Sequence, residues 1–130
     1  MSSFEIIGGH PLSGEITPQG AKNEALQVIC ATLLTDKEVI INNIPNIRDV
    51  NKLIELLEYL GVVVNKLGKE SYSFQANRVD ISRIYTERYS QMAASLRGSI
   101  MLVGPLLARF KEAYIPTPGG DKIGRRRLDT

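Results

Sequence analysis

Residues 20–34 read Gly-Ala-Lys-Asn-Glu-Ala-Leu-Gln-Val-Ile-Cys-Ala-Thr-Leu-Leu, and this stretch changes the periodicity of the chain. Its apolar residues recur at spacings of three and four, which predicts an amphipathic helix from Lys22 to Leu34. The first N–H groups of a helix are unpaired and its dipole is positive there, so Lys22 adds charge to an anion site. An ordinary glycine turn with a solvated lysine explains the same residues equally well. Cys30 falls on the apolar face, where we expect a small buried hydrophobe rather than a nucleophile.

Short strands and a second helix are expected around this helix as far as residue 75. The second helix spans Asp49–Tyr59, with Asp49 as its cap and Gly61 at its end. The expected strands lie at residues 3–8, 14–17, 37–42, 62–66 and 71–75, and the last two form a hairpin. Residues 14–75 therefore follow the order strand–helix–strand–helix–strand–strand.

The following residues continue with the same kinds of element. We expect a connection at 76–88 with a short strand at 79–84, a helix at 89–107 that bends at Gly104-Pro105, and a strand at 111–115. Arg97 lies inside the apolar helix, where it either pairs with an acid, projects to solvent or reaches an anionic ligand. The helix end, turn and strand at 106–115 resemble those at 33–41, which hints at repeated units.

A glycine-rich basic segment ends the sequence: Pro118-Gly119-Gly120-Asp121-Lys122-Ile123-Gly124-Arg125-Arg126-Arg127-Leu128-Asp129. Glycine gives this loop backbone freedom, and its arginines follow a single carboxylate. Such a loop suits an anionic, phosphate-bearing substrate. A surface turn with a basic tail is the alternative.

Composition excludes several classes of protein. The 130 residues are 43% apolar, which suits one folded domain, and the net charge of +2 is too small and dispersed to indicate nucleic acid. The single cysteine excludes an internal disulfide. His10 is the only histidine, so a metal site is not expected. We find no secretory start and no apolar run long enough for a membrane, and we expect a cytoplasmic protein.

The stretch Gly20-Ala21-Lys22-Asn23 before a helix resembles the opening signature of the enolpyruvyl transferases. The resemblance continues in the same order over nearly the whole chain. It includes Leu33-Leu34, Asn43-Ile44-Pro45, Asp49-Val50, Leu60-Gly61, Leu96-Arg97-Gly98-Ser99-Ile100, Gly104-Pro105-Leu106, Ala108-Arg109-Phe110 and Pro118-Gly119-Gly120. Asn23 favours the branch of the family that uses a nucleotide sugar, because the branch that uses shikimate 3-phosphate typically has serine there.

The resemblance implies an α/β (α+β) fold. This fold is an inside-out α/β barrel of repeated βαβαββ units, with helices packed inward, and it is incomplete in this chain. Two such globes face each other across a cleft in the family. Residues 1–21 would belong to the second globe and residues 22–130 to the first. Because family chains are much longer, we expect these residues to be an N-terminal fragment, which leaves open edges that favour self-association.

The resemblance also assigns roles to individual residues. Lys22 and Asn23 match residues that contact phosphoenolpyruvate and the sugar substrate, and Arg97 matches an arginine that contacts the nucleotide sugar. Arg126 matches the loop arginine that holds phosphoenolpyruvate. A segment that lines the nucleotide-sugar pocket matches Arg126, Arg127, Leu128, Asp129 and Thr130, although Arg127 replaces the usual proline.

Asp121 stands where most members carry a reactive cysteine, and a minority carry aspartate. In the family, the residue at this position protonates C3 of phosphoenolpyruvate. The antibiotic fosfomycin alkylates the cysteine thiol, so an enzyme with aspartate at this position should resist fosfomycin. The implied reaction transfers the enolpyruvyl group to the 3′-hydroxyl of UDP-N-acetylglucosamine, without a metal or organic cofactor, and begins peptidoglycan synthesis. The alternatives are the shikimate 3-phosphate reaction, or a non-catalytic fragment that only folds or self-associates.

Overall fold

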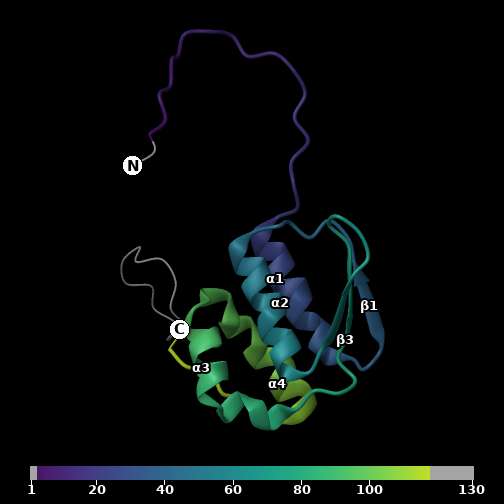
Figure 1. Ribbon diagram of the computed structural model, residues 1–130. Helices are drawn as coiled ribbons and strands as arrows, with labels where there is room; N and C mark the ends of the chain where they lie inside the picture. Colours follow the sequence, from purple (N-terminus) through teal and green to yellow (C-terminus); the bar gives the residue numbers. More distant parts are fainter. Residues whose placement is uncertain (1–2, 118–130) are drawn as a thin grey trace.

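The computed structural model describes residues 3–117, in which helices cover one side of a small sheet (Figure 1). The elements, with 3-10 helices labelled η, run α1 (Lys22–Ala31), η1 (Thr32–Leu34), β1 (Glu38–Ile41), α2 (Arg48–Leu60), β2 (Val63–Lys66), β3 (Tyr72–Gln75), η2 (Ile81–Tyr85), α3 (Glu87–Ala94), η3 (Arg97–Leu102) and α4 (Val103–Phe110). The chain is thus a mixed α/β fold, as predicted. Its sheet is open and antiparallel, and the described residues form no closed barrel.

The sheet has the order β1-β3-β2, and both outer strands run antiparallel to β3. Phe74 of β3 is opposite Val39 on one side and Val64 on the other, and its ring is fully buried against the helices. Residues one position along point to the other face, which explains why Ile40 and Val63 are exposed. The predicted strands at 37–42, 62–66 and 71–75 and their hairpin are confirmed.

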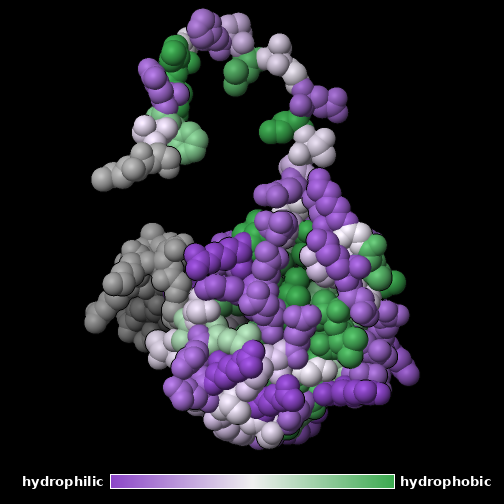
Figure 2. Space-filling view, in the orientation of Figure 1, coloured by the Kyte–Doolittle hydropathy of each residue, from purple (hydrophilic) through white to green (hydrophobic). Residues whose placement is uncertain are grey.

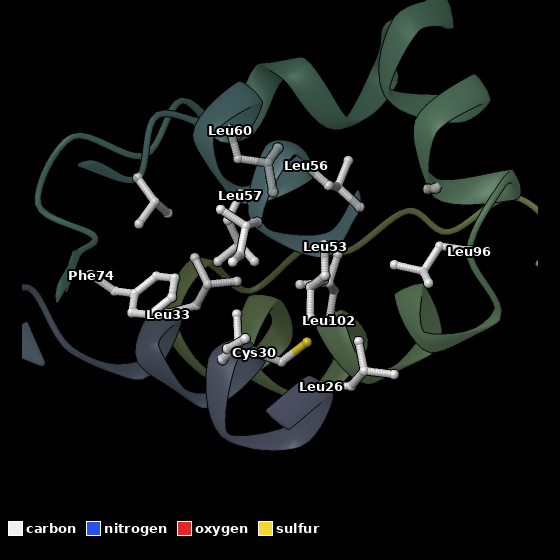
Figure 3. Close-up of a cluster of buried hydrophobic side chains, with 14 of the residues drawn as sticks. Leu26, Cys30, Leu33, Leu53, Leu56, Leu57, Leu60, Phe74, Leu96 and Leu102 are labelled. Carbon is white, nitrogen blue, oxygen red and sulfur yellow. The ribbon is translucent and has the colours of Figure 1, made fainter. Parts of the chain in front are cut away.

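The core is organised around α2, whose leucines meet side chains from α1, β3 and η3 (Figure 3). The fully buried residues of α2 are Val50, Leu53, Leu56, Leu57 and Leu60. Gly61 ends the helix with φ 101°, and its N–H donates to backbone carbonyl oxygens of the last turn, as predicted. Asp49 does not cap α2: Ile47 is the N-cap residue, and the Asp49 carboxylate instead accepts from Lys22.

Two predicted strands near the N-terminus are wrong. Residues 3–8 and 14–17 have no regular structure, and residues 3–19 are exposed. Figure 1 shows this segment in an arc away from the helices, and Figure 2 shows its apolar side chains standing clear of the body. Within residues 3–117 these segments find no strand to pair with, and alternation alone cannot hold an isolated strand.

The predicted strand at 79–84 is also wrong, because η2 occupies Ile81–Tyr85. The carboxylate of Asp80 accepts from the backbone N–H of Ser82 at 3.2 Å and from its hydroxyl at 2.6 Å. An aspartate side chain that accepts a hydrogen bond from the backbone N–H two residues later stabilises a turn. Here that turn begins the 3-10 helix η2.

The long helix predicted at 89–107 is three helices, and it breaks at Ser95-Leu96 rather than at Gly104-Pro105. Leu96 has extended backbone angles (φ −133°, ψ 116°). Pro105 lies in the first turn of α4, where a helix needs no N–H donor, so it does not break the helix.

The strand predicted at 111–115 does not form. Lys111 ends α4 in the left-handed region, with φ 67° and its N–H bonded to Leu107 O at 3.1 Å. Ala113 and Ile115 then pack against the core instead of pairing with a strand. The second copy of the helix–turn–strand pattern is therefore only half formed within the described chain.

Candidate functional site

Three of the predicted site residues, Lys22, Asn23 and Arg97, meet at one surface pocket. The pocket lies where the first turn of α1, the first turn of α2 and η3 come together. Its lining residues are Lys22, Asn23, Leu26, Gln27, Asp49, Arg97, Gly98, Ile100 and Met101. The residues named from two separate motifs of the sequence therefore share a single site.

Lys22 is the first residue of α1, and its ammonium group lies 3.1 Å from Asp49 Oδ2. Both side chains are about two-fifths exposed (44% and 41%), so solvent screens the pair and its attraction is weak. The pair joins the N-terminal turns of α1 and α2. Helix N-termini carry partial positive charge, which favours an anion at this end of the pocket.

Arg97 opens η3 and is half-buried at the pocket. Within residues 3–117 its guanidinium has no ion pair and no hydrogen bond to protein. Gly98 brings η3 close to α1, since an added Cβ would lie 3.0 Å from Leu26 Cδ1. This contact holds Arg97 beside the start of α1, where a guanidinium has several N–H donors with which to bind an anion.

Gly20 sets the position at which α1 begins. A Cβ on Gly20 would overlap the carbonyl oxygen of Asn43 and would lie 3.1 Å from Pro45 Cδ. Asn43 itself adopts φ 60°, a left-handed conformation that asparagine tolerates better than most residues. The stretches at Gly20 and at Asn43-Ile44-Pro45, which are separate in the sequence, are therefore in backbone contact and fix the start of α1.

Two polar residues of the pocket were missed by sequence reasoning. Asp49 was assigned only a capping role, and Gln27 was not singled out. The spacing of Asn23 and Gln27 on α1, four residues apart and therefore on one face, was a signal that could have identified Gln27.

Cys30 takes no part in the site. Its side chain is buried between α1 and α2, and burial raises the pKa of the thiol from 9.0 to about 12. Because the thiolate is the reactive form, the prediction of a small buried hydrophobe is confirmed.

The remaining predicted site residues lie outside the described residues, namely Asp121, Arg126, Arg127, Leu128, Asp129 and Thr130. In the part of the chain that the structure covers, no three His, Cys, Asp or Glu side chains are grouped so that they could bind a metal ion. No helix of residues 3–117 has the length and apolar character that crossing a membrane requires.

Comparison with known proteins places the chain in a family. The sequence profile of the EPSP synthase (3-phosphoshikimate 1-carboxyvinyltransferase) family matches residues 6–130. The chain is 62% identical over its whole length to the UDP-N-acetylglucosamine 1-carboxyvinyltransferase of Bacteroides fragilis, and 56% to that of Porphyromonas gingivalis. The enzyme of the same name from Bradyrhizobium diazoefficiens is 44% identical over 127 residues, which are 98% of this chain and 28% of that protein. The chain spans about 30% of the length of the Bacteroides and Porphyromonas relatives. Because the family match covers nearly the whole sequence, the chain belongs to the EPSP synthase (3-phosphoshikimate 1-carboxyvinyltransferase) family.

Proposed function

We propose that this chain supplies part of the active site of a UDP-N-acetylglucosamine 1-carboxyvinyltransferase. The enzyme transfers the enolpyruvyl group of phosphoenolpyruvate to the 3′-hydroxyl of UDP-N-acetylglucosamine and releases phosphate, the first committed step of peptidoglycan synthesis. The observation that carries this proposal is the convergence of Lys22, Asn23 and Arg97 on one pocket. The names of the relatives support the nucleotide sugar as acceptor.

The pocket suits two anionic substrates. Lys22 binds the phosphate or carboxylate of phosphoenolpyruvate, Arg97 binds the nucleotide sugar, and Asn23 supplies a neutral hydrogen-bonding group in the same pocket. Asp49 competes for Lys22 in the absence of substrate. Because that pair is solvent-exposed, its exchange for a substrate anion costs no more than about 1 kcal/mol.

Asp121 and Arg126 complete the proposed chemistry. The 3′-oxygen bonds to C2 of phosphoenolpyruvate as the hydroxyl proton leaves to a base or to solvent, and Asp121 delivers a proton to C3, so C2 becomes a tetrahedral centre. Loss of phosphate from C2 and of a proton from C3 then restores the double bond on the product. Lys22, Arg97 and Arg126 stabilise the charge that develops on the phosphate and carboxylate.

The element order also supports a wider architectural proposal. Residues 22–75 run helix–strand–helix–strand–strand, which is a βαβαββ unit without its first strand. We assign this segment to one unit of an inside-out α/β barrel, with residues 1–21 in a second globe and residues 22–130 in the first.

A chimera tests the function despite the short length of the chain. This chain replaces the matching 130 residues of the Bacteroides fragilis relative, and phosphate release is measured with UDP-N-acetylglucosamine or with shikimate 3-phosphate. Turnover only with the nucleotide sugar is expected. Turnover only with shikimate 3-phosphate would move the protein to the other branch, and no turnover with either substrate would contradict the proposal.

Calorimetry on the unmodified chain addresses the non-catalytic alternative. UDP-N-acetylglucosamine should bind the chain, and Arg97→Ala should weaken that binding. Binding that is unchanged in Arg97→Ala would place the nucleotide sugar away from the described pocket.

A further inference from the structure

One face of α2 carries two residues with different contacts: Asp49 bonds to Lys22 of the pocket, and Lys52 bonds to the chain shortly before Arg97. Asp49 and Lys52 are three residues apart, so their side chains lie next to each other on the helix. Asp49 accepts from Lys22. Lys52 donates from Nζ to the carbonyl oxygen of Ser95 at 3.2 Å and to its hydroxyl at 3.3 Å.

Ser95 is the point at which α3 ends and the chain turns toward Arg97. Its N–H donates to Gln91 O and Met92 O, and its hydroxyl donates to Met92 O at 2.8 Å. The carbonyl oxygens at a helix C-terminus have no partner within the helix and carry partial negative charge. The Lys52 ammonium is therefore favourable at this position for two reasons. It donates a hydrogen bond, and it is a cation at the negative end of α3.

The extended residue Leu96 follows, and Arg97 then begins η3. Leu96 is buried, with 2% of its surface exposed, so it cannot turn freely between Ser95 and Arg97. We therefore expect a shift of the Ser95 carbonyl to move the backbone of Arg97 as well. Lys52 does not line the pocket.

We propose that Lys52 is a positioning residue for Arg97: it fixes the turn at Ser95 and so directs the guanidinium to the anionic substrate. The proposal rests on the proposed function of the pocket. Helix α2 therefore supports both cations of the pocket. Asp49 holds Lys22 by direct contact, and Lys52 holds Arg97 through Ser95. Lys52 acts on substrate binding rather than on the chemical step.

The kinetic test uses the chimera with Lys52→Met, which keeps most of the side-chain length and removes the charge and the donors. We expect KM for UDP-N-acetylglucosamine to rise about fivefold with little change in kcat, the effect of losing about one hydrogen bond. Lys52→Arg, which retains a donor and a charge, should recover most of the loss. Lys69→Met is the matched control, since Lys69 is exposed in the β2–β3 loop, and it should leave KM unchanged.

A double-mutant comparison separates positioning from general stability. In an Arg97→Ala background, Lys52→Met should cause no further rise in KM, because the residue through which it acts is gone. An equal rise in both backgrounds would overturn the proposal.

NMR on the unmodified chain provides a readout that does not depend on enzyme activity. Lys52→Met should shift the backbone amide and side-chain Nε signals of Arg97, while Lys69→Met should leave them in place. Unmoved Arg97 signals in Lys52→Met would overturn the positioning role. If the unsubstituted chimera is inactive but these signals move, the proposed function fails and the positioning role stands.

Discussion

Lys22 and Asp49, on different helices, face each other across the first turns of α1 and α2, with Lys22 Nζ 3.1 Å from Asp49 Oδ2. Residues of both turns line the pocket together with Arg97 of η3. The ion pair thus joins α1, which carries the residue proposed to bind phosphoenolpyruvate, to α2, around which the core is organised.

The Lys22–Asp49 pair should matter more for activity than for stability. In the chimera, Lys22→Ala should lower kcat/KM by about 100-fold, because a charge-assisted contact to the substrate anion is worth about 2–3 kcal/mol. The free energy of unfolding should change by less than about 1 kcal/mol, since the pair is exposed. Urea denaturation and steady-state kinetics provide the two values. A loss of activity that parallels a loss of stability would assign Lys22 a structural role instead.

Gly20→Ala should disturb the start of α1, because the new Cβ would meet the Asn43 carbonyl oxygen, a backbone atom that cannot rotate away. We expect a loss of about 1–3 kcal/mol of stability, the usual cost of an overpacked contact, together with weaker binding of UDP-N-acetylglucosamine. Gly104→Ala is the control, since nothing lies within 4 Å of its Cβ position in α4. Alanine is the better helix former there and should leave stability unchanged or raise it. Equal effects of the two substitutions would refute the close-contact explanation.

Arg109 should be a structural residue. Its Nη1 atom donates to Leu33 O and Thr35 O, both at 3.0 Å, and so joins α4 to the end of η1. Arg109→Ala leaves these carbonyl oxygens without that donor and should cost about 2 kcal/mol. Arg78→Ala changes an exposed arginine in a connection and should cost little. Chemical denaturation of both variants checks this prediction, which fails if they lose the same stability.

The Cys30 thiol should be inert in the folded chain. Burial raises its pKa to about 12, so almost no thiolate exists at neutral pH. A disulfide reagent should react slowly with the native chain and quickly after denaturation. The same shift means that the unfolded chain loses this proton first as pH rises, so stability declines between about pH 9 and pH 12. Cys30→Ala should weaken that decline, and rapid labelling of the native chain would contradict the buried position.

Asp121 should act as the proton donor and confer fosfomycin resistance. In the chimera, Asp121→Ala should abolish turnover while UDP-N-acetylglucosamine still binds in calorimetry. Asp121→Cys should keep activity and gain inactivation by fosfomycin, because a thiolate is a better nucleophile than a carboxylate. Near-normal turnover of Asp121→Ala would exclude the acid role. Continued resistance of Asp121→Cys would show that residue 121 does not occupy the alkylated position.

Local sequence signals correctly predicted the elements whose formation depends mainly on the residues within them. The 3.6-residue period predicted a helix over Lys22–Leu34, which the structure forms as α1 followed by the 3-10 helix η1. Gly61 was correctly placed at the end of α2 because only a residue without a Cβ adopts its φ easily. The hairpin strands β2 and β3 were found in the same way. Where such a signal was weaker than a tertiary or side-chain effect, the prediction was wrong. A strand was predicted at 79–84, but the hydrogen bonds of the Asp80 side chain favour the 3-10 helix η2 there. A strand was also predicted at 3–8, but these residues have no strand to pair with in the described part of the chain.

The sequence by itself determined the family, the amphipathic helices and the identity of Lys22, Asn23 and Arg97 as candidate ligands, because these depend on residue type and order. Only the tertiary structure decided that these three side chains share a pocket, that Asp49 bonds to Lys22 rather than capping α2, and that Lys52 reaches Ser95. These contacts join residues far apart in the chain, and their geometry depends on how α1, α2 and η3 pack around a common core. No local pattern of residues encodes that packing.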